Sequence, residues 1–259
     1  MSTTGYFRIY LVAGLGMAAT VVLAILVSQA AFVSNAGIAG AVASPAVRNA
    51  ILLSIFTSLL AAVLGMLVAV PSAYLLARNE FPGKSIIDAM LDVPVIMSPV
   101  ALGLALLLVF RTWPGQWIET HLVRFVFEVP GIVLAQFVLA LALEVRVLKA
   151  AFEEINPRFE QVARCLGCSP GSAFLRVTLP MARPGLVAGF VLGWARAIGD
   201  FGATVMVAGA MPGKTETIPV AIYLGLASLR IEHSVVLSLL LTLIALAALL
   251  ALRWMGKAR

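Results

Sequence analysis

Apolar residues of this 259-residue chain gather in six long stretches, and polar residues fall mostly between them. A helix needs roughly 20 apolar residues to cross the hydrocarbon core of a bilayer. The pattern therefore predicts an all-α membrane protein with six transmembrane helices, at residues 9–33, 51–77, 88–110, 129–149, 184–208 and 233–252. The first stretch is longer than the apolar part of a secretory signal and lacks a small-residue cleavage site, so we expect it to be retained.

One polar interruption, residues 150–183, is typical of two short helices joined by a turn. Asn156 and Ser169 are good helix-capping residues, and each is followed by a proline, which suits the first position of a helix. We expect Gly167 to end the first helix, because a left-handed terminal residue costs glycine little. Pro180 is expected to limit the second, since a residue before proline is pushed away from helical angles.

The first of these short helices has two faces. Its apolar residues recur at helical spacing and its polar side chains fall elsewhere; the apolar set is Phe159, Val162, Ala163 and Leu166, and the polar set is Arg158, Glu160, Gln161 and Arg164. Such a helix on a membrane protein suits an apolar groove on a partner protein. The alternative is a helix that lies flat on the inner leaflet.

The composition predicts a membrane protein, and the distribution of basic residues predicts its orientation. Hydrophobic residues make up 62% of the chain and charged residues 12%, and the mean hydropathy is +1.06. If both termini are cytoplasmic, 12 of the 18 basic residues lie on the inner side and five on the outer side, which satisfies the positive-inside rule. The net charge of +6 follows from this bias, so we expect membrane lipid and no nucleic acid as a partner.

Two of the predicted spans contain features unusual for a membrane helix. Pro94 and Pro99 interrupt the third, which predicts an irregular span: either it lies beside a cavity, with Ser98 as a pathway candidate, or it is simply kinked. In the fifth, Arg196 and Asp200 are four residues apart, so they share a helix face and can pair. Charges inside a membrane rarely face lipid. The pair either gates the conducting path or holds the span in the bundle, and Thr204 nearby is a second hydroxyl candidate for the path.

Several motifs that would indicate other functions are incomplete. Cys165 and Cys168 form a C-x-x-C, but no second Cys or His pair completes a metal site, and we interpret them as small residues at a helix end. Residues 208–215 have the length of a phosphate-binding loop, but Ala208 replaces its first glycine. No hydrolase or metalloprotease motif occurs. We therefore expect no catalytic residue, no cofactor and no metal.

The segment FEQVARCLGCSPGSAFLRVTLPMARPGLVAG resembles the cytoplasmic EAA loop of type I ABC-importer permeases. Ala163, Gly167 and the Leu179–Pro180 pair stand at the family's spacing. Gln161 stands where the family usually has a glutamate, and Glu160 precedes it as a candidate for that acid. The later stretch WARAIGDFGATVMVAGAMPGKTETIPVAIY resembles the molybdate permease branch, to which sulfate and tungstate permeases are close. The resemblance covers most of residues 50–252.

The resemblance implies a permease of an ATP-driven oxyanion importer in a bacterial or archaeal inner membrane, molybdate being the expected substrate and tungstate or sulfate the alternatives. Its expected partners are two ATP-binding subunits, a second permease copy and an extracytoplasmic oxyanion-binding protein. A coupling helix would bind the ATPase through Phe159, Glu160, Gln161, Ala163, Arg164, Leu166 and Gly167. We expect an N-terminal helix and loop at 1–49, a permease core at 50–252 and a tail at 253–259. A stand-alone ion-coupled carrier, with Arg196 and Asp200 as its relay, is the alternative from another class.

Overall fold

Helices make up the architecture of the computed structural model, which describes residues 3–32 and 44–257. The longest are α1 (Thr3–Ala31), α3 (Pro45–Arg78), α7 (Val129–Glu154) and α14 (Ile231–Lys257). These four are long and apolar enough to cross a membrane, and two bent helix pairs bring the number of spans to as many as six. Residue 33 of the predicted first span and residues 258–259 of the predicted tail lie outside the described part.

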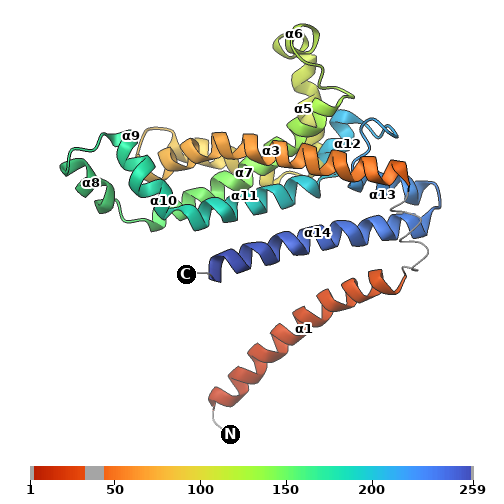
Figure 1. Cartoon of the computed structure of the whole chain (residues 1–259), viewed down its shortest axis with the longest axis horizontal. Helices are drawn as coiled ribbons and strands as arrows, with labels where there is room; N and C mark the ends of the chain where they lie inside the picture. The colour runs from red at the N-terminus through yellow and green to blue at the C-terminus, as the bar shows by residue number, and fades with distance from the viewer. Residues whose placement is uncertain (1–2, 33–43, 258–259) are drawn as a thin grey trace.

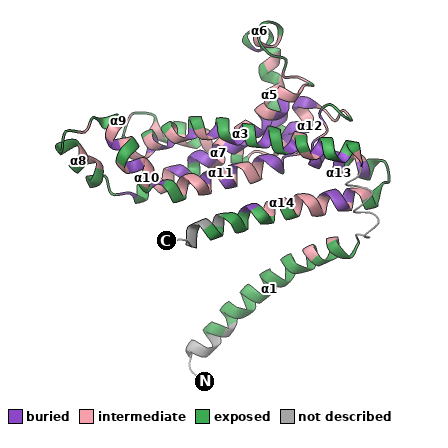
Figure 2. Cartoon of the chain, in the orientation of Figure 1, coloured by how far each residue is buried: buried purple, intermediate pink, exposed green. Residues whose placement is uncertain are grey.

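The core of the bundle is formed by α3, α7 and α11 (Arg183–Ile198), which run side by side (Figure 1). The face that α3 presents to this core consists largely of small residues, among them Ala61, Ala62, Gly65, Ala69 and Ala73, all buried. Small side chains let helix backbones approach closely, which is how helices gain packing energy in a membrane. Figure 2 shows the result as purple stripes along the inner faces of these helices.

The third predicted span is broken, as its prolines indicated. The α4 helix (Lys84–Ile96) and the α5 helix (Pro99–Arg111) meet at an angle of 117°. Ser98 begins α5, because its hydroxyl accepts a hydrogen bond from the backbone N–H of Ala101 at 3.3 Å. Together with α6 (Trp113–His121), α5 projects sideways from the bundle (Figure 1).

The fifth predicted span, 184–208, was wrong as a single helix. The α11 helix ends at Ile198, and α12 (Gly202–Ala208) starts a new one. Asp200 lies between them, and its carboxylate accepts hydrogen bonds from the backbone N–H and the hydroxyl of Thr204, at 2.8 and 2.9 Å. An acidic side chain placed before a helix satisfies the free N–H groups of its first turn, so Asp200 supports the start of α12 instead of extending α11.

Residues 209–232 lie between the fifth and sixth predicted spans and do more than connect them. This segment contains α13 (Ile218–Ala227), an apolar helix too short to span a membrane and largely buried. It packs between α3 and α14 in a cluster that includes Val47, Ala50 and Leu237. The hydroxyl of Ser54 on α3 accepts a hydrogen bond from the backbone N–H of Ile218 at 2.7 Å and so fixes where α13 begins.

The polar segment 150–183 forms its two helices, but the second does not stop at Pro180. The first is α8 (Arg158–Cys165). The second combines α9 (Pro170–Ala173), a π-helical turn η1 (Phe174–Thr178) and α10 (Leu179–Met181), and it then bends by 72° into α11. A π-turn shifts the backbone hydrogen bonds by one residue, and the helical segment continues through Pro180 to Met181.

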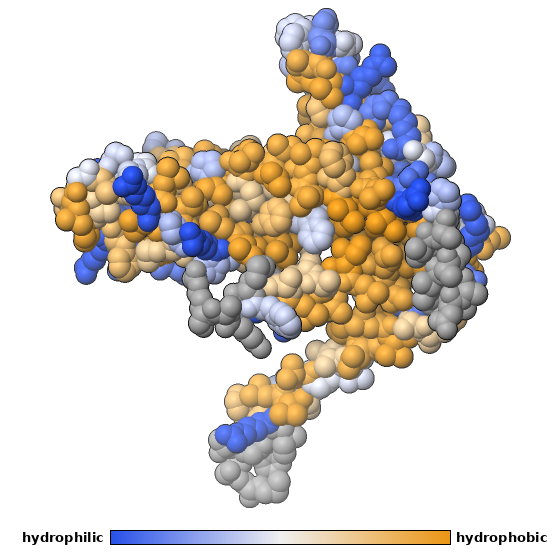
Figure 3. Space-filling view, viewed as in Figure 1, coloured by the Kyte–Doolittle hydropathy of each residue, from blue (hydrophilic) through white to orange (hydrophobic). Residues whose placement is uncertain are grey.

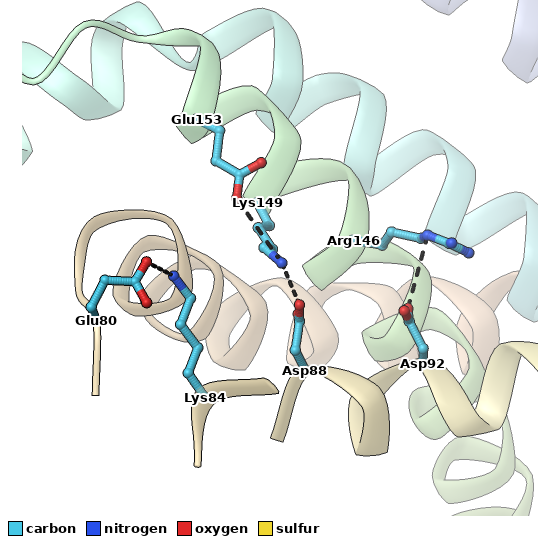
Figure 4. Close-up of polar contacts among 7 residues, drawn as sticks. All are labelled: Glu80, Lys84, Asp88, Asp92, Arg146, Lys149 and Glu153. Atoms are coloured by element: carbon cyan, nitrogen blue, oxygen red, sulfur yellow. Dashed lines mark hydrogen bonds and ion pairs between the residues drawn. The ribbon is translucent and has the colours of Figure 1, made fainter. Parts of the chain in front are cut away.

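The surface agrees with a membrane location. Hydrophobic side chains cover the middle of the bundle, and hydrophilic ones gather around the α8–α9 end and near the opposite end (Figure 3). At the first of these ends α4 is tied to α7 by ion pairs, Lys149 with Asp88 and Arg146 with Asp92 (Figure 4). These are basic residues that the positive-inside rule assigns to the inner side.

Candidate functional site

The α8 helix is held at the end of the bundle by a single acid, Glu160. Its carboxylate accepts hydrogen bonds from the hydroxyl of Tyr74 at 2.8 Å, from Nε of Arg78 at 3.0 Å and from the hydroxyl of Thr178 at 2.7 Å. Tyr74 and Arg78 come from the end of α3, and Thr178 ends the π-turn. One side chain therefore joins three segments and sets where α8 lies.

The charge of Glu160 is favoured by these donors. Burial of the carboxylate opposes ionisation, but the hydrogen bonds from Thr178 and Tyr74 and the positive charge of Arg78 outweigh it and lower the pKa of Glu160 from its ordinary value. The Arg78–Glu160 pair is also well shielded, with the two side chains 10% and 14% exposed. Glu160 is thus held by neighbouring segments, whereas Gln161 is exposed; that Glu160 takes the place of the family's acid stays a prediction.

Both ends of α8 are formed by the residues that the sequence predicted, Asn156 and Gly167. The side-chain oxygen of Asn156 accepts a hydrogen bond from the N–H of Arg158 at 3.0 Å. At the other end, Gly167 has a φ of +93°, the N–H of Cys168 donates to the carbonyl of Ala163, and the N–H of Gly167 donates to that of Arg164. This pair of bonds is the Schellman motif, which requires a left-handed residue at the position of Gly167.

The apolar residues of α8 are left uncovered. Phe159, Val162 and Leu166 are 52%, 58% and 81% exposed, while Ala163 is half-buried and Arg164 is exposed. A hollow of about 310 Å³ lies beside Phe159 and is lined in part by Ile155, Met181 and Gly185. A rigidly held helix with an open apolar face has the form of a docking element.

The pathway candidates lie where the two broken spans meet. Arg196 pairs with Asp200 at 3.7 Å, and Asp200 is bonded to Thr204, so the structure brings these three together. A Cβ added to Gly202 would lie 2.7 Å from the Cβ of Pro99, which puts the start of α5 against the start of α12. Ser98 is exposed next to this contact, and its hydroxyl supports the start of α5; among the described residues it bonds to neither Arg196 nor Asp200.

Sequence reasoning missed two buried polar residues on α7, Gln136 and Glu144. Both are completely buried, and the amide oxygen and nitrogen of Gln136 and the two carboxylate oxygens of Glu144 lack a hydrogen-bond partner among the described residues. The signal was present, because an acid in the run LALALEVR interrupts an apolar stretch. Ionisable residues in a membrane span are rare and lean toward function.

The family is settled by comparison with known proteins. A family model described as "Binding-protein-dependent transport system inner membrane component" matches residues 61–258. The chain belongs to this permease family. Among curated relatives, it is 38% identical to the molybdenum transport system permease protein ModB of Escherichia coli K12, over 68% of this chain and 78% of the relative. It is 34% identical to the sulfate transport system permease protein CysW of Synechocystis, over 78% and 74%.

Solved permease-family structures have the same fold. A chain of a bacterial alginate ABC transporter in complex with an alginate pentasaccharide-bound periplasmic protein superimposes with a TM-score of 0.75, covering 98% of this chain and 96% of the other. The identity is 16%, so this likeness concerns the fold. The expectation of an importer permease fold is confirmed.

Proposed function

We propose that this protein is the membrane-spanning subunit of an ATP-driven importer for an oxyanion, and that the oxyanion is molybdate. Three ModB relatives from Escherichia coli and Haemophilus influenzae, at 36–38% identity, support this substrate. The CysW relative supports sulfate as the second candidate. The chain itself carries no catalytic motif, so ATP hydrolysis belongs to a separate subunit.

The observation that carries the proposal is that α8 is firmly anchored to the bundle and at the same time leaves its apolar residues exposed. Glu160 fixes the helix to α3 and to the π-turn, and Phe159, Val162 and Leu166 are exposed. We assign α8 as the coupling helix that binds a groove on the ATP-binding subunit. Motion of that subunit then reaches α11 through the π-turn and α10, which connect directly to it.

The direction of insertion follows from charge and topology. The N-terminal end of α1 and the C-terminal end of α14 point the same way as α8 (Figure 1), and α8 follows the end of α7 that carries the ion-paired residues Arg146 and Lys149 (Figure 4). We assign this end to the cytoplasm, with both termini there. The complete importer would contain two copies of this chain, two ATP-binding subunits and an extracytoplasmic binding protein.

Uptake into proteoliposomes tests the proposal. The permease is reconstituted with or without the ATP-binding subunit and the binding protein, and radiolabelled molybdate, tungstate and sulfate compete for entry. We expect uptake of molybdate that requires ATP and both partners, with sulfate competing weakly. Uptake by the permease alone would favour the ion-coupled carrier and end the importer assignment; preference for sulfate would overturn the substrate only.

A further inference from the structure

Glu144 occupies a slot that the neighbouring helices leave open for its side chain. It lies within α7 and is 0% exposed, and neither carboxylate oxygen has a hydrogen-bond partner in the described parts of the chain. Gly65 of α3 and Gly193 of α11 face it from two sides, and a Cβ at either position would overlap its oxygens. Leaving a buried polar group unpaired is costly, so a slot built around one indicates that a partner arrives in another conformation.

Arg196 is the cation placed to be that partner. It is three residues from Gly193 on α11, so the two share a helix face. Side chains of a helix lean toward its N-terminus, a direction that carries the guanidinium of Arg196 toward Gly193 and the carboxylate beyond it.

The present contact of Arg196 runs the opposite way and is weak. Arg196 reaches toward Asp200, past the C-terminal end of α11, at 3.7 Å, and its side chain remains 36% exposed. Oδ2 of Asp200 is already bonded by the N–H and hydroxyl of Thr204, while Oδ1 has no hydrogen bond among the described residues. Asp200 would therefore keep two donors if Arg196 left it.

We propose that Arg196 alternates between Asp200 and Glu144, and that Glu144 is a further positioning residue of the transport cycle. On Asp200, Arg196 ties α11 to the start of α12; on Glu144, it ties α11 to α7. Two acids that compete for one guanidinium make the exchange less costly than breaking a buried pair outright. This inference rests on the proposed permease function. It states that the ion pair of Arg196 with Asp200 is replaced by a pair with Glu144 when α11 moves.

A distance measurement on the permease alone in lipid nanodiscs tests the exchange. Cys165 and Cys168 are changed to Ser, and spin labels are placed at the exposed positions Ala105 on α5 and Ala150 on α7. Because α5 packs on α12 through Leu102, Ala203 and Val207, the labels report how α12 stands relative to α7.

Relative to the unsubstituted protein, Glu144→Gln should shift the population toward the distance of this structure, and Asp200→Asn should shift it toward a second distance. Arg196→Gln should abolish the difference between those two variants, and Arg196→Lys, which keeps the charge, should restore it. A purely structural role for Glu144 does not predict opposite shifts. Identical distributions for Glu144→Gln and Asp200→Asn, in protein that elutes as a single species, would overturn the exchange.

The two proposals fail separately. The distance measurement needs neither ATPase nor substrate, so a permease that supports ATP-dependent uptake yet shows no opposite shifts overturns the exchange alone. A chain that shows the shifts but takes up no anion with its ATPase present overturns the proposed function alone.

Discussion

Two acidic side chains in this protein, Glu160, which is half-buried, and Glu144, which is completely buried, are treated in opposite ways. Glu160, at the α8 end, has three hydrogen-bond donors from two other segments, whereas Glu144, in the middle of the bundle, has none among the described residues. A fully satisfied network rigidifies the part that contains it, and an unsatisfied one marks a part under strain or awaiting a partner. The α8 end is therefore built to stay in place, and the α7–α11 contact is built to change.

The largest effect should follow removal of the satisfied acid. Glu160→Ala leaves the guanidinium of Arg78 without its partner in a largely buried place, and breaking such a pair costs about 3–5 kcal/mol. We expect α8 to detach and the ATP-binding subunit to be lost during co-purification. The matched control is Glu80→Ala, an acid just after α3 whose side chain is 89% exposed; equal recovery of the ATPase with both variants would contradict the anchor role.

A smaller effect should follow filling of the Glu144 slot. Gly193→Ala places a Cβ onto the carboxylate, and overpacking of this kind costs about 1–3 kcal/mol. We expect a lower midpoint of thermal unfolding, whereas Gly14→Ala, where an added Cβ meets nothing within 4 Å, should leave it unchanged or raised. Adding Glu144→Ala to Gly193→Ala should recover part of the loss; if it recovers none, the two residues do not share the slot.

A substitution at the Schellman end of α8 should have a smaller effect than filling the Glu144 slot. Gly167→Ala forces an alanine to a φ of +93° in otherwise open space, and a left-handed conformation costs roughly 1–2 kcal/mol. We expect ATPase binding to weaken several-fold in a titration. Gly171→Ala, in the same segment but without a positive φ, serves as the control, and equal affinities for the two variants would show that the end of α8 does not matter for docking.

The smallest effect should come from protonation of Glu160, which leaves α8 unchanged near neutral pH and loosens it only in acid. Since its pKa is lowered from the ordinary 4.5, its contribution to the anchoring of α8 is fully present above about pH 4.5 and is lost as the pH falls through the lower folded value. A spin label on Cys165 in a Cys168→Ser background should show constant mobility from pH 7 to 5 and rising mobility below 4.5. In Glu160→Gln this pH dependence should vanish; a rise that persists there would have another origin.

Sequence patterns predicted local features well because those depend on residues close together in the chain. The caps at Asn156 and Ser169, the helix end at Gly167 and the break near Ser98 all follow from side chains within four residues. The family resemblance was likewise readable in the EAA-like segment. The predicted division into 1–49, 50–252 and 253–259 stays a prediction.

Features that depend on distant residues were not predictable from the pattern. The α13 helix was missed because ten apolar residues are too few for a span, and only its contacts with α3 and α14 make it buried. The contacts of Glu160 could not be foreseen, because Tyr74, Arg78 and Thr178 lie on other segments of the chain. Glu144 went unnoticed because its slot requires glycines from two other helices, Gly65 and Gly193.

The central claim, that α8 faces the cytoplasm and binds an ATPase, is tested most directly by labelling the native thiol of Cys165, which is exposed on α8. The protein carries Cys168→Ser, and a membrane-impermeant maleimide is added to inside-out or right-side-out vesicles. We predict labelling only in inside-out vesicles and protection when the ATP-binding subunit is added. Labelling from the outer face would contradict the account.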